Sequence, residues 1–321
     1  MRAIVIEEHG GPEVLRLTER PDPTPGPGEA LVDVESRGVN FIDIYQRSGA
    51  YSVPLPFVPG MEAAGVVAAV GEGVTDLSVG QRVGWAMAPG GYADRAVVEA
   101  GLLVPLPDGV SADQAAALFL QGLTAHYLTH SVHPVAEGDT VLVHAAAGGT
   151  GLLITQLAKE RGARVIGTVS TEEKERVARA AGADEVIRYT ESPVAESVRD
   201  LTGGEGVAAV YDGVGRDTFD ASLASLRPRG MLALFGQASG AVEPVDPQRL
   251  NAAGSVYLAR PSLAYFVADR EELLGRCRDL FSLLEAGRLD VRIGGPYPLA
   301  DAGRAHADLA ARRTTGKLLL T

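Results

Sequence analysis

The chain has 321 residues, of which 46% are hydrophobic and 22% charged, and its formal net charge is −12. The negative charge argues against nucleic acid and anionic membrane surfaces as partners. A single cysteine, Cys277, excludes an internal disulfide, and no apolar run reaches the roughly 18 residues of a membrane span. We therefore expect a cytoplasmic protein of about two domains, whose partners are small molecules or other subunits.

The first third of the chain predicts a β-rich domain. Apolar and polar residues alternate over residues 30–39, where Val32 and Val34 stand against Asp33 and Glu35, as in a half-buried strand. Further strands, separated by glycines, are expected at residues 2–6, 63–70, 80–85 and 92–98. Together they indicate a barrel or a sandwich, and the segment that follows, residues 111–132, is dense in good helix formers.

Residues 140–174 predict one continuous dinucleotide-binding unit. An apolar run ends in a turn of small residues, a helical pattern follows, and a second apolar run begins at Arg164. A pyrophosphate would lie on backbone N–H groups at the start of that helix, where a side chain at Gly148 or Gly149 would hold the phosphates away. Gly151 would let the helix and the strand pack closely. The flanking strands and helix support this interpretation more strongly than the glycines alone.

The end of the second strand favours NADPH over NADH. NAD sites usually place an Asp or Glu there, whereas a 2′-phosphate needs hydroxyl groups and cations. Here Ser170 and Thr171 end the strand, and Lys174, one of only three lysines in the chain, follows one turn later. Glu172 and Glu173 beside it leave open the alternative that Lys174 simply lies on a solvated helix face.

The next elements continue the alternation of strands and helices. Strands are expected at residues 207–212 and 230–236, with a helix near 216–226 between them, and both strands are apolar throughout. This alternation predicts a doubly wound parallel sheet, which binds ligands at the carboxyl ends of its strands. The segments expected near the glycine turn are therefore Asp212–Gly215, which includes Val214, and Phe235–Ala238. Helices at 269–287 and 299–312 and a strand at 317–320 close the chain.

No metal motif or covalent nucleophile is evident. The six histidines show no paired spacing backed by cysteines or carboxylates, and His126 and His130, four residues apart, have no third ligand in view. The segment around Ser239, GQASG, is not the G-x-S-x-G elbow of serine hydrolases. We therefore expect neither a bound metal nor covalent catalysis.

Seven blocks carry a resemblance to a known family: GVNFIDIYQRSGAY, PGMEAAGVVAAVG, QGLTAHYL, HAAAGGTGLL, GTVSTEEK, YDGVGRDTF and ARPSL. In order and spacing they resemble the NADPH-dependent quinone oxidoreductases, the zinc-free, ζ-crystallin-like branch of the medium-chain dehydrogenases/reductases. The resemblance implies an α/β protein with a Rossmann doubly wound parallel sheet and a GroES-like β-rich catalytic domain, with the active site in the cleft between them. It also implies a homodimer.

The implied domains are a catalytic domain whose first segment is 1–121, a Rossmann NADPH-binding domain at 122–263, and a second catalytic segment at 264–321. The resemblance also accounts for the missing metal. Where zinc alcohol dehydrogenases carry a Gly-His-Glu block, this chain has Met61 before Glu62, and a thioether does not replace an imidazole as a zinc ligand. Asn40 stands near the position of the first zinc-binding Cys.

The resemblance assigns cofactor contacts to individual residues. The nicotinamide side is formed by Asn40, Phe41, Ile42, Asp43, Ile44 and Tyr45, with Phe235, Gly236, Gln237 and Ala238 bordering the ring. Tyr127, Gly149 and Thr150 match the pyrophosphate region, and Ser170, Lys174, Tyr189 and Arg312 match the 2′-phosphate shell. The chain departs from the usual family residues at Thr150, Ser170, Gly213 and Gln237; none of these changes removes a charge or closes the turn, so the implied cofactor is the same, whereas the acceptor pocket is the part they affect.

The reaction expected is hydride transfer from NADPH to a quinone-like acceptor without a metal. Asn40, Tyr45 and Tyr51 are the candidates for orienting the nicotinamide and the acceptor oxygen, although tyrosines in a barrel are often packing residues. Two alternatives stay open. One is a reductase of activated C=C bonds in enones or alkenals, and the other is a crystallin-like protein that binds NADPH with little turnover.

Overall fold

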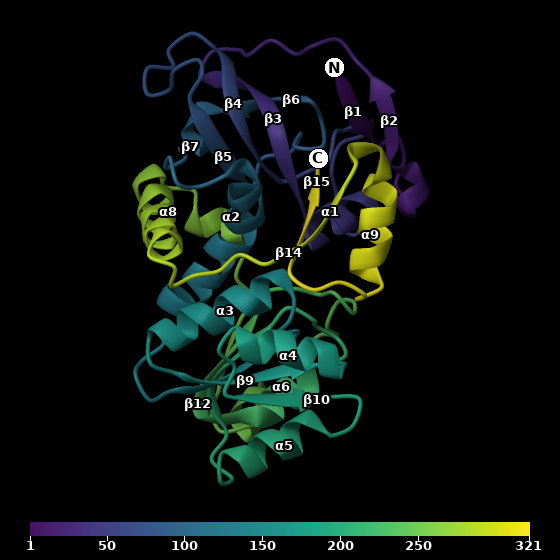
Figure 1. The fold of residues 1–321 in the computed structure, drawn as a ribbon. Helices are drawn as coiled ribbons and strands as arrows, with labels where there is room; N and C mark the ends of the chain where they lie inside the picture. Colours follow the sequence, from purple (N-terminus) through teal and green to yellow (C-terminus); the bar gives the residue numbers. More distant parts are fainter. The chain divides into compact units, whose positions relative to one another are not determined.

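The computed structural model describes residues 1–321, which divide into two compact units. Unit 1 comprises Met1–Leu123, Val267–Glu285 and Val291–Thr321, and unit 2 comprises Thr124–Phe266 and Ala286–Asp290. The division along the chain thus falls after Leu123 and Phe266, and residues 286–290 of the expected second catalytic segment group with unit 2. In Figure 1, unit 1 contains both the purple amino-terminal and the yellow carboxyl-terminal segments.

Unit 1 is built around a seven-stranded sheet. Its path is β14-β15-β3-β4-β5-β7, with β6 also paired to β3, and β1 and β2 form a separate two-stranded sheet. The strands are β1 (Arg2–Val5), β2 (Arg16–Glu19), β3 (Glu29–Val39), β4 (Glu62–Val70), β5 (Arg82–Ala86), β6 (Arg95–Glu99), β7 (Val104–Pro105), β14 (Ile293–Tyr297) and β15 (Lys317–Leu320). The last strand of the chain, β15, lies antiparallel beside β3, with Leu318 opposite Val39 (Figure 1).

Helices and buried side chains complete unit 1. The helices are α1 (Phe41–Arg47), α8 (Arg270–Glu285), α9 (Ala302–Ala310) and the part of α2 (Ala112–Tyr127) up to Leu123, with 3-10 turns at Pro12–Val14, Ala100–Leu102 and Leu299–Asp301. Trp85, the only tryptophan in the chain, is fully buried in a core with Val32, Val67 and Leu103. A second core joins Ile4 and Tyr92 to Leu318 and Leu320, so the carboxyl-terminal strand is packed into the domain formed by the start of the chain.

Unit 2 is a six-stranded parallel sheet of order β10-β9-β8-β11-β12-β13. The strands are β8 (Thr140–Val143), β9 (Arg164–Val169), β10 (Glu185–Arg188), β11 (Val207–Asp212), β12 (Leu226–Leu234) and β13 (Tyr257–Ala259). From β8 the chain adds β9 and then β10 on one side of the sheet. It then crosses back to form β11 on the other side of β8 and continues to β12 and β13, so the direction in which strands are added reverses between β8 and β11. This is the strand order of the Rossmann fold and confirms the predicted doubly wound parallel sheet.

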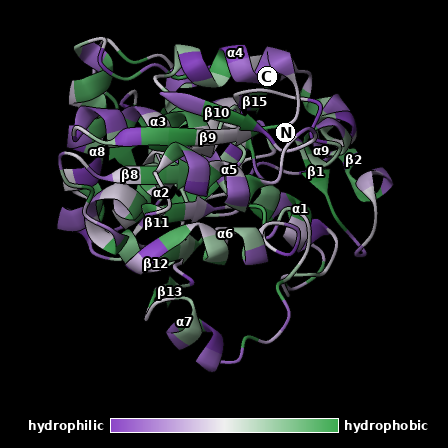
Figure 2. Cartoon of the chain, turned by 90° about the horizontal axis from the view of Figure 1, so that it is seen from below, coloured by the Kyte–Doolittle hydropathy of each residue, from purple (hydrophilic) through white to green (hydrophobic).

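The connections of unit 2 are mostly helical. They are a π-helical turn (Leu128–Val132), α3 (Gly149–Glu160), α4 (Glu172–Ala180), α5 (Val194–Leu201), α6 (Phe219–Ser225), α7 (Gln248–Ala252) and a 3-10 turn (Leu263–Phe266). The central strands are buried on both faces, and β11 is buried at all six positions. Figure 2 shows the strands in order from β10 to β13, with β9 green along most of its length and α4 largely purple.

Several short elements were not expected from the sequence. The chain forms β2, β10, β14, α5 and α7 in segments where no periodic pattern was evident, and helix α1 occupies Phe41–Arg47, within the block expected to face the nicotinamide. A local signal for α1 was present, because Asn40 and Asp43 have the three-residue spacing of a capping box. No helix of the structure is long and apolar enough to cross a membrane.

Candidate active site and cofactor site

The glycine turn of unit 2 opens directly onto helix α3. Strand β8 ends at Val143, and α3 begins after Gly148, whose backbone is extended (φ −82°, ψ 165°) and which carries no side chain to cap the helix. The first N–H groups of a helix have no partner within it, so this start presents backbone donors where an anion can bind. The arrangement fits the pyrophosphate of a dinucleotide.

Gly151 is required for a different reason from Gly148. A Cβ atom at Gly151 would lie 2.4 Å from the carbonyl oxygen of Ala145 and 2.9 Å from Cα of Ala146, both of which are backbone atoms of the turn. At Gly148 the nearest atom would be the Ala145 oxygen at 3.2 Å, a contact that a small shift relieves. Gly151 therefore lets α3 pack against the turn itself, rather than against a neighbouring strand.

Three of the four residues expected around a 2′-phosphate gather at the ends of β9 and β10. Ser170 follows β9, and the carbonyl oxygen of Ser170 accepts a hydrogen bond of 3.2 Å from the hydroxyl of Thr190. Tyr189 follows β10, is 44% exposed, and donates its backbone N–H to Val169. Lys174 lies in the first turn of α4, which Thr171 caps by accepting the Lys174 N–H at 3.2 Å.

The fourth of these residues, Arg312, belongs to unit 1. It follows α9 and adopts a left-handed backbone conformation with a φ of 57°. This agrees with the domain bounds expected from the sequence, which placed Arg312 in the catalytic segment 264–321 and the other three residues in the Rossmann domain.

The loops after β11 and β12 are joined by their backbones. Phe235 donates its N–H to the Asp212 carbonyl at 2.9 Å, and Ala238 donates to Gly213 at 3.2 Å. A Cβ atom at Gly236 would lie 2.5 Å from the Gly213 oxygen, so close approach of the two loops requires glycine there. The expected nicotinamide-bordering segments, including Val214 and Gln237, therefore form one surface at the carboxyl end of the sheet.

A buried polar network that sequence reasoning missed links the ends of β8, β9 and β11. Imidazole nitrogens of His144 lie 3.0 Å from the Thr168 hydroxyl and 2.9 Å from the Ser222 hydroxyl, and Ser222 donates to Asp212 at 2.7 Å. Burial lowers the pKa of His144, opposed by the charge of Asp212. The His144 imidazole, immediately before the glycine turn in the chain, thus links Thr168 at the end of β9 to Asp212 at the end of β11 through Ser222. The sequence did contain one indication of this network, because His144 directly follows the apolar run of β8.

Tyr127 is a packing residue on the unit 2 side of the structure. Its side chain is 2% exposed and its ring stacks on Phe266, with centroids 4.3 Å apart and planes within 5°. Burial raises the pKa of its hydroxyl. The ring of Tyr127 is therefore held by packing on Phe266 within unit 2.

In unit 1 the expected nicotinamide-side residues form helix α1 and its cap. Asn40 precedes the helix, and its N–H donates to Asp43 Oδ2 at 2.9 Å, while Asp43 Oδ1 accepts the N–H of Met61 at 3.0 Å. The fully buried Asp43 carboxylate therefore ties the start of α1 to the residue before β4. Burial raises the pKa of Asp43 to about 6, opposed by the charge of Lys317 and by these hydrogen bonds.

The aromatic residues of this segment form a half-buried cluster. The Tyr45 and Tyr51 rings lie 5.1 Å apart at an angle of 56°, and Phe41 lies 6.1 Å from Tyr45. The backbone N–H of Tyr51 donates to the Tyr45 carbonyl at 3.0 Å, which holds the loop after α1 against the helix. The structure thus brings together two of the three residues expected to orient the reactants.

Asn40 is the third residue expected to orient the reactants, and its side-chain amide is enclosed by protein groups. Its oxygen accepts hydrogen bonds from Lys317 Nζ at 2.7 Å and Gln121 Nε2 at 2.6 Å. Its nitrogen donates to the Gly38 carbonyl at 3.1 Å and to Glu62 Oε2 at 3.2 Å. Lys317 and Glu62 also form a buried ion pair. Asn40 is 2% exposed, and its two N–H donors and its oxygen are all engaged within the protein.

A second buried chain starts from the other face of Asp43. Tyr92 donates to Asp43 Oδ2 at 3.2 Å, its hydroxyl lies 3.0 Å from His306 Nε2, and Arg47 Nη1 lies 3.3 Å from His306 Nδ1. Arg47 can only donate, so His306 accepts at Nδ1 and donates from Nε2, which is the neutral tautomer. Burial, with the nearby Arg47 charge, lowers the pKa of His306 to about 3.

Glu62, Gln121 and Lys317 were absent from the residues expected at the site. The first two stand within blocks that carried the family resemblance, but nothing in their local pattern marked them. Lys317 did carry a signal, since it is one of three lysines and begins an otherwise apolar strand. No group of three or more His, Cys, Asp or Glu side chains in the structure is arranged to hold a metal ion.

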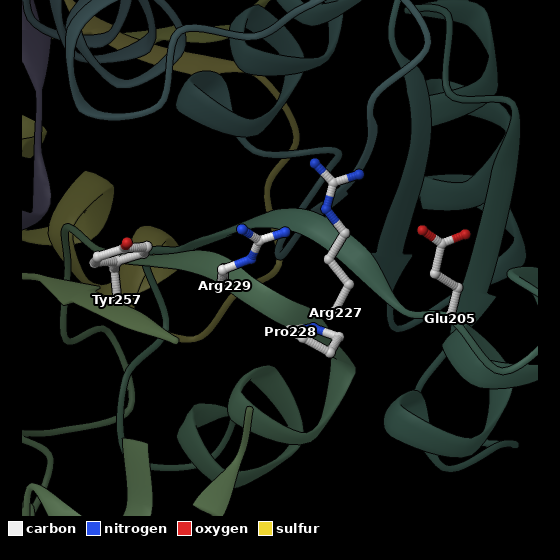
Figure 3. Close-up of a pocket in the computed structure, with 5 residues that line it drawn as sticks. All are labelled: Glu205, Arg227, Pro228, Arg229 and Tyr257. Atoms are coloured by element: carbon white, nitrogen blue, oxygen red, sulfur yellow. The ribbon is translucent and has the colours of Figure 1, made fainter. Parts of the chain in front are cut away.

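A hollow of about 570 Å³ in unit 2 lies away from these residues. It is lined by Glu205, Arg227, Pro228, Arg229 and Tyr257. Figure 3 shows the two arginines side by side between Tyr257 and Glu205. Arg227 is near the start of β12 and Tyr257 starts β13, so the hollow is at the amino ends of these strands, opposite the end expected to bind the cofactor.

Comparison with known proteins agrees with this geometry. Residues 26–108 match the alcohol dehydrogenase GroES-like domain, and residues 149–270 match the zinc-binding dehydrogenase family. A quinone oxidoreductase of Pseudomonas aeruginosa is 46% identical over 99% of both chains. The chain belongs to the quinone oxidoreductase family of the medium-chain dehydrogenases/reductases. The predicted family, and the predicted combination of a Rossmann sheet with a GroES-like domain, are therefore confirmed.

Two further relatives bear on the chemistry of this quinone oxidoreductase family member. A solved structure of an Escherichia coli quinone oxidoreductase complexed with NADPH is 44% identical and superposes with a TM-score of 0.98, covering 100% of this chain and 99% of that one. A 2-haloacrylate reductase of a Burkholderia species is 42% identical over 99% of this chain and 98% of its own length.

Proposed function

We propose that this protein is an NADPH-dependent quinone oxidoreductase that works without a metal. The single observation that carries the proposal is the uncapped, glycine-lined start of α3 in a chain that matches quinone oxidoreductases along its whole length. The NADPH complex of the Escherichia coli relative supports the same cofactor here.

Unit 2 provides the cofactor site. The backbone of Gly148, Gly149, Thr150 and Gly151 receives the pyrophosphate at the helix start. Ser170, Lys174 and Tyr189 at the ends of β9 and β10, together with Arg312, favour a 2′-phosphate over a free hydroxyl. NADPH bound there supplies a hydride at C4 of the nicotinamide ring, and the loops that contain Val214 and Phe235 border that ring.

Unit 1 provides the residues that orient the acceptor. Tyr45 and Tyr51 offer two half-buried phenol groups held at a fixed angle, which suits hydrogen bonding to a quinone oxygen. Hydride addition and one proton convert a quinone to a hydroquinone, and the ring becomes aromatic. Such an acceptor needs positioning more than polarisation, so the absence of a Lewis acid costs it less than it would cost an aldehyde.

A reductase of activated C=C bonds is the second candidate. It is supported by the 2-haloacrylate reductase, which is nearly as similar as the quinone oxidoreductases. The same hydride donor and the same phenol groups would serve an electron-poor alkene whose negative charge develops on a carbonyl or carboxylate oxygen.

Steady-state NADPH oxidation tests the assignment. We expect kcat/KM for 1,4-naphthoquinone to exceed that for aliphatic aldehydes by at least about a hundredfold, equivalent to about 3 kcal/mol. Similar rates with aldehydes would contradict the quinone assignment. An enone or 2-haloacrylate that outpaces every quinone by the same margin would replace it with the second candidate.

We also propose a cytoplasmic homodimer. The edge strand β13 has one side without a strand partner in this chain, and Tyr257 on it is 58% exposed. Pairing of two such edges would cover them. The single cysteine is buried and free, which suits a reducing compartment. Light scattering at micromolar concentration should give twice the mass of one 33.4 kDa chain.

A further inference from the structure

A buried ion pair in unit 1 has no role in the proposed hydride transfer. Lys317 is 3% exposed and Glu62 is fully buried, and their charged atoms lie 2.5 Å apart. Isolated charges are costly to bury, and even a good pair seldom adds stability over an apolar replacement. A pair retained in the interior therefore calls for an explanation other than stability.

The hydrogen-bond pattern fixes the charge of both groups. Lys317 Nζ contacts three acceptor oxygens, on Asn40 at 2.7 Å, on Gln121 at 2.6 Å and on Glu62. Only an ammonium has three N–H donors to satisfy them. The Glu62 carboxylate accepts hydrogen bonds from the Leu120 N–H at 2.6 Å, from the Asn40 amide and from Lys317. All three partners are donors, so the carboxylate is in its ionised form.

The same pattern sets the orientation of the Asn40 amide. Its oxygen faces the Lys317 ammonium, and its NH₂ group faces the Glu62 carboxylate and the Gly38 carbonyl. Turning the amide over would place NH₂ against the ammonium and oxygen against two acceptors. The pair therefore permits one orientation, and Asn40 is the residue from which helix α1 starts.

The surrounding backbone is shaped around this pair. A Cβ atom at Gly38 would lie 2.2 Å from Glu62 Oε2 and 2.7 Å from Lys317 Cε, with the Ala116 carbonyl at 2.6 Å. Glycine at 38 thus leaves the space that the two charged side chains fill. The cluster joins the end of β3, the start of β4, helix α2 and the start of β15.

We propose that Lys317, acting with Glu62 through the amide of Asn40, is a positioning residue for helix α1 and for the acceptor-orienting tyrosine Tyr45 on it. Asn40 thereby holds α1 in place from within the protein rather than by offering its amide to a ligand. The catalytic part of this inference rests on the proposed function, whereas its effect on α1 does not.

The test compares three variants. Lys317→Met leaves Glu62 buried and unpaired, so it should unfold at lower urea concentration, as followed by fluorescence of the buried Trp85 of unit 1. The double variant Lys317→Met/Glu62→Gln removes both charges, and the NH₂ group of the new glutamine faces the Asn40 amide. This double variant should recover most of the lost stability. Lys159→Met breaks a surface ion pair of 2.8 Å with Asp184 and serves as the matched control.

In the folded double variant we expect kcat/KM for 1,4-naphthoquinone to fall by about tenfold or more, with a raised KM for the quinone. The Kd for NADPH, measured by its fluorescence, should stay within about twofold, because neither the glycine turn nor Ser170, Lys174 and Tyr189 of unit 2 is changed. Backbone amides of residues 41–47 should exchange with deuterium faster than in the wild type, while those of α3 keep the wild-type rate. The control should match the wild type in every measurement.

Wild-type kinetics and wild-type exchange of α1 in the double variant would overturn the inference. A lower kcat with unchanged KM and unchanged exchange would also overturn it, since that pattern only reports fewer active molecules. If the wild type reduces no quinone, the proposed function fails instead, and the exchange of residues 41–47 alone decides whether Lys317 positions α1.

Discussion

The two units hold their functional groups in opposite ways. Unit 2 relies on backbone atoms from one short stretch, where the turn after β8 and the start of α3 lie within about ten residues of each other in the sequence. Unit 1 relies on side chains from four distant segments, with Asn40, Glu62, Gln121 and Lys317 meeting in one buried cluster. We therefore expect the site of unit 2 to be most sensitive to added side-chain atoms at its glycines. The cluster of unit 1 should be most sensitive to removal of one partner of its buried ion pair.

The largest effect is expected from loss of space in unit 2. Gly151→Ala would force a methyl group to within 2.4 Å of a backbone oxygen, so the turn must shift. Overpacking of this kind costs about 3 kcal/mol at the upper end, and we expect NADPH affinity to fall by about a hundredfold. Fluorescence of Trp85, which reports on unit 1, should show an unchanged unfolding transition.

Gly148→Ala is the matched control for that change. Its methyl group has space within the protein, so unit 2 should remain as stable as the wild type while the phosphates are held away and binding weakens. Equal loss of unit 2 stability in both variants would show that the two glycines do not differ in role.

The stability of unit 1 should depend on pH through the buried His306. The pKa of His306 is about 3 in the folded protein, below the roughly 6.5 of an unfolded chain, so the unfolded state binds more protons between these values. Stability supplied by the neutral imidazole is therefore present above about pH 6.5 and is lost as the pH falls. At pH 5 the loss amounts to about 2 kcal/mol relative to pH 8.

His306→Gln isolates this contribution. Glutamine can accept from Arg47 and donate to Tyr92 as the neutral imidazole does, but it cannot be protonated. Urea unfolding followed by Trp85 should show that the variant loses about 2 kcal/mol less than the wild type between pH 8 and pH 5. Asp43 titrates in both proteins, so its opposite contribution cancels. Parallel pH profiles would mean that His306 is protonated as easily when folded as when unfolded.

The contrast between the units also explains what the sequence could predict. The turn, its helix and the central strands follow local patterns, so the doubly wound parallel sheet and its glycine turn were predicted, whereas the edge strands β10 and β13 were not. The cluster around Asn40 depends on β15 pairing with β3, a contact between residues almost 280 positions apart. No local pattern encodes that pairing, and Glu62, Gln121 and Lys317 were therefore missed. Helix α1 was missed although its capping spacing was visible.

A smaller effect is expected from the two cations predicted to recognise the 2′-phosphate, Lys174 of unit 2 and Arg312 of unit 1. Lys174→Ala removes a cation beside the strand end expected to hold the 2′-phosphate, and Arg312→Ala removes the second expected cation. A hydrogen bond to a charged group contributes about 1.5 to 3 kcal/mol, so each change should raise the Kd for NADPH by about tenfold or more. The Kd for NADH should stay the same. Equal losses with both cofactors would show that neither residue recognises the phosphate.

The smallest effect is expected where the two loops of unit 2 meet. Gly213 is one of the positions where the sequence resemblance indicated a departure from the usual residue, and a Cβ atom there would lie 2.8 Å from the ring of Phe235. The ring is the free end of a side chain and can rotate at a cost of about 0.5 to 1.5 kcal/mol. Gly213→Ser should therefore change the KM for the quinone by roughly twofold to tenfold.

Gly236→Ala provides the comparison for Gly213→Ser, because its methyl group would meet the Gly213 carbonyl oxygen at 2.5 Å. A backbone oxygen joined to the neighbouring loop cannot rotate away, so this variant should lose unit 2 stability and NADPH binding together. If Gly213→Ser is as damaging as Gly236→Ala, Phe235 is held as rigidly as the backbone. Unit 2 would then share with unit 1 a dependence on fixed side chains.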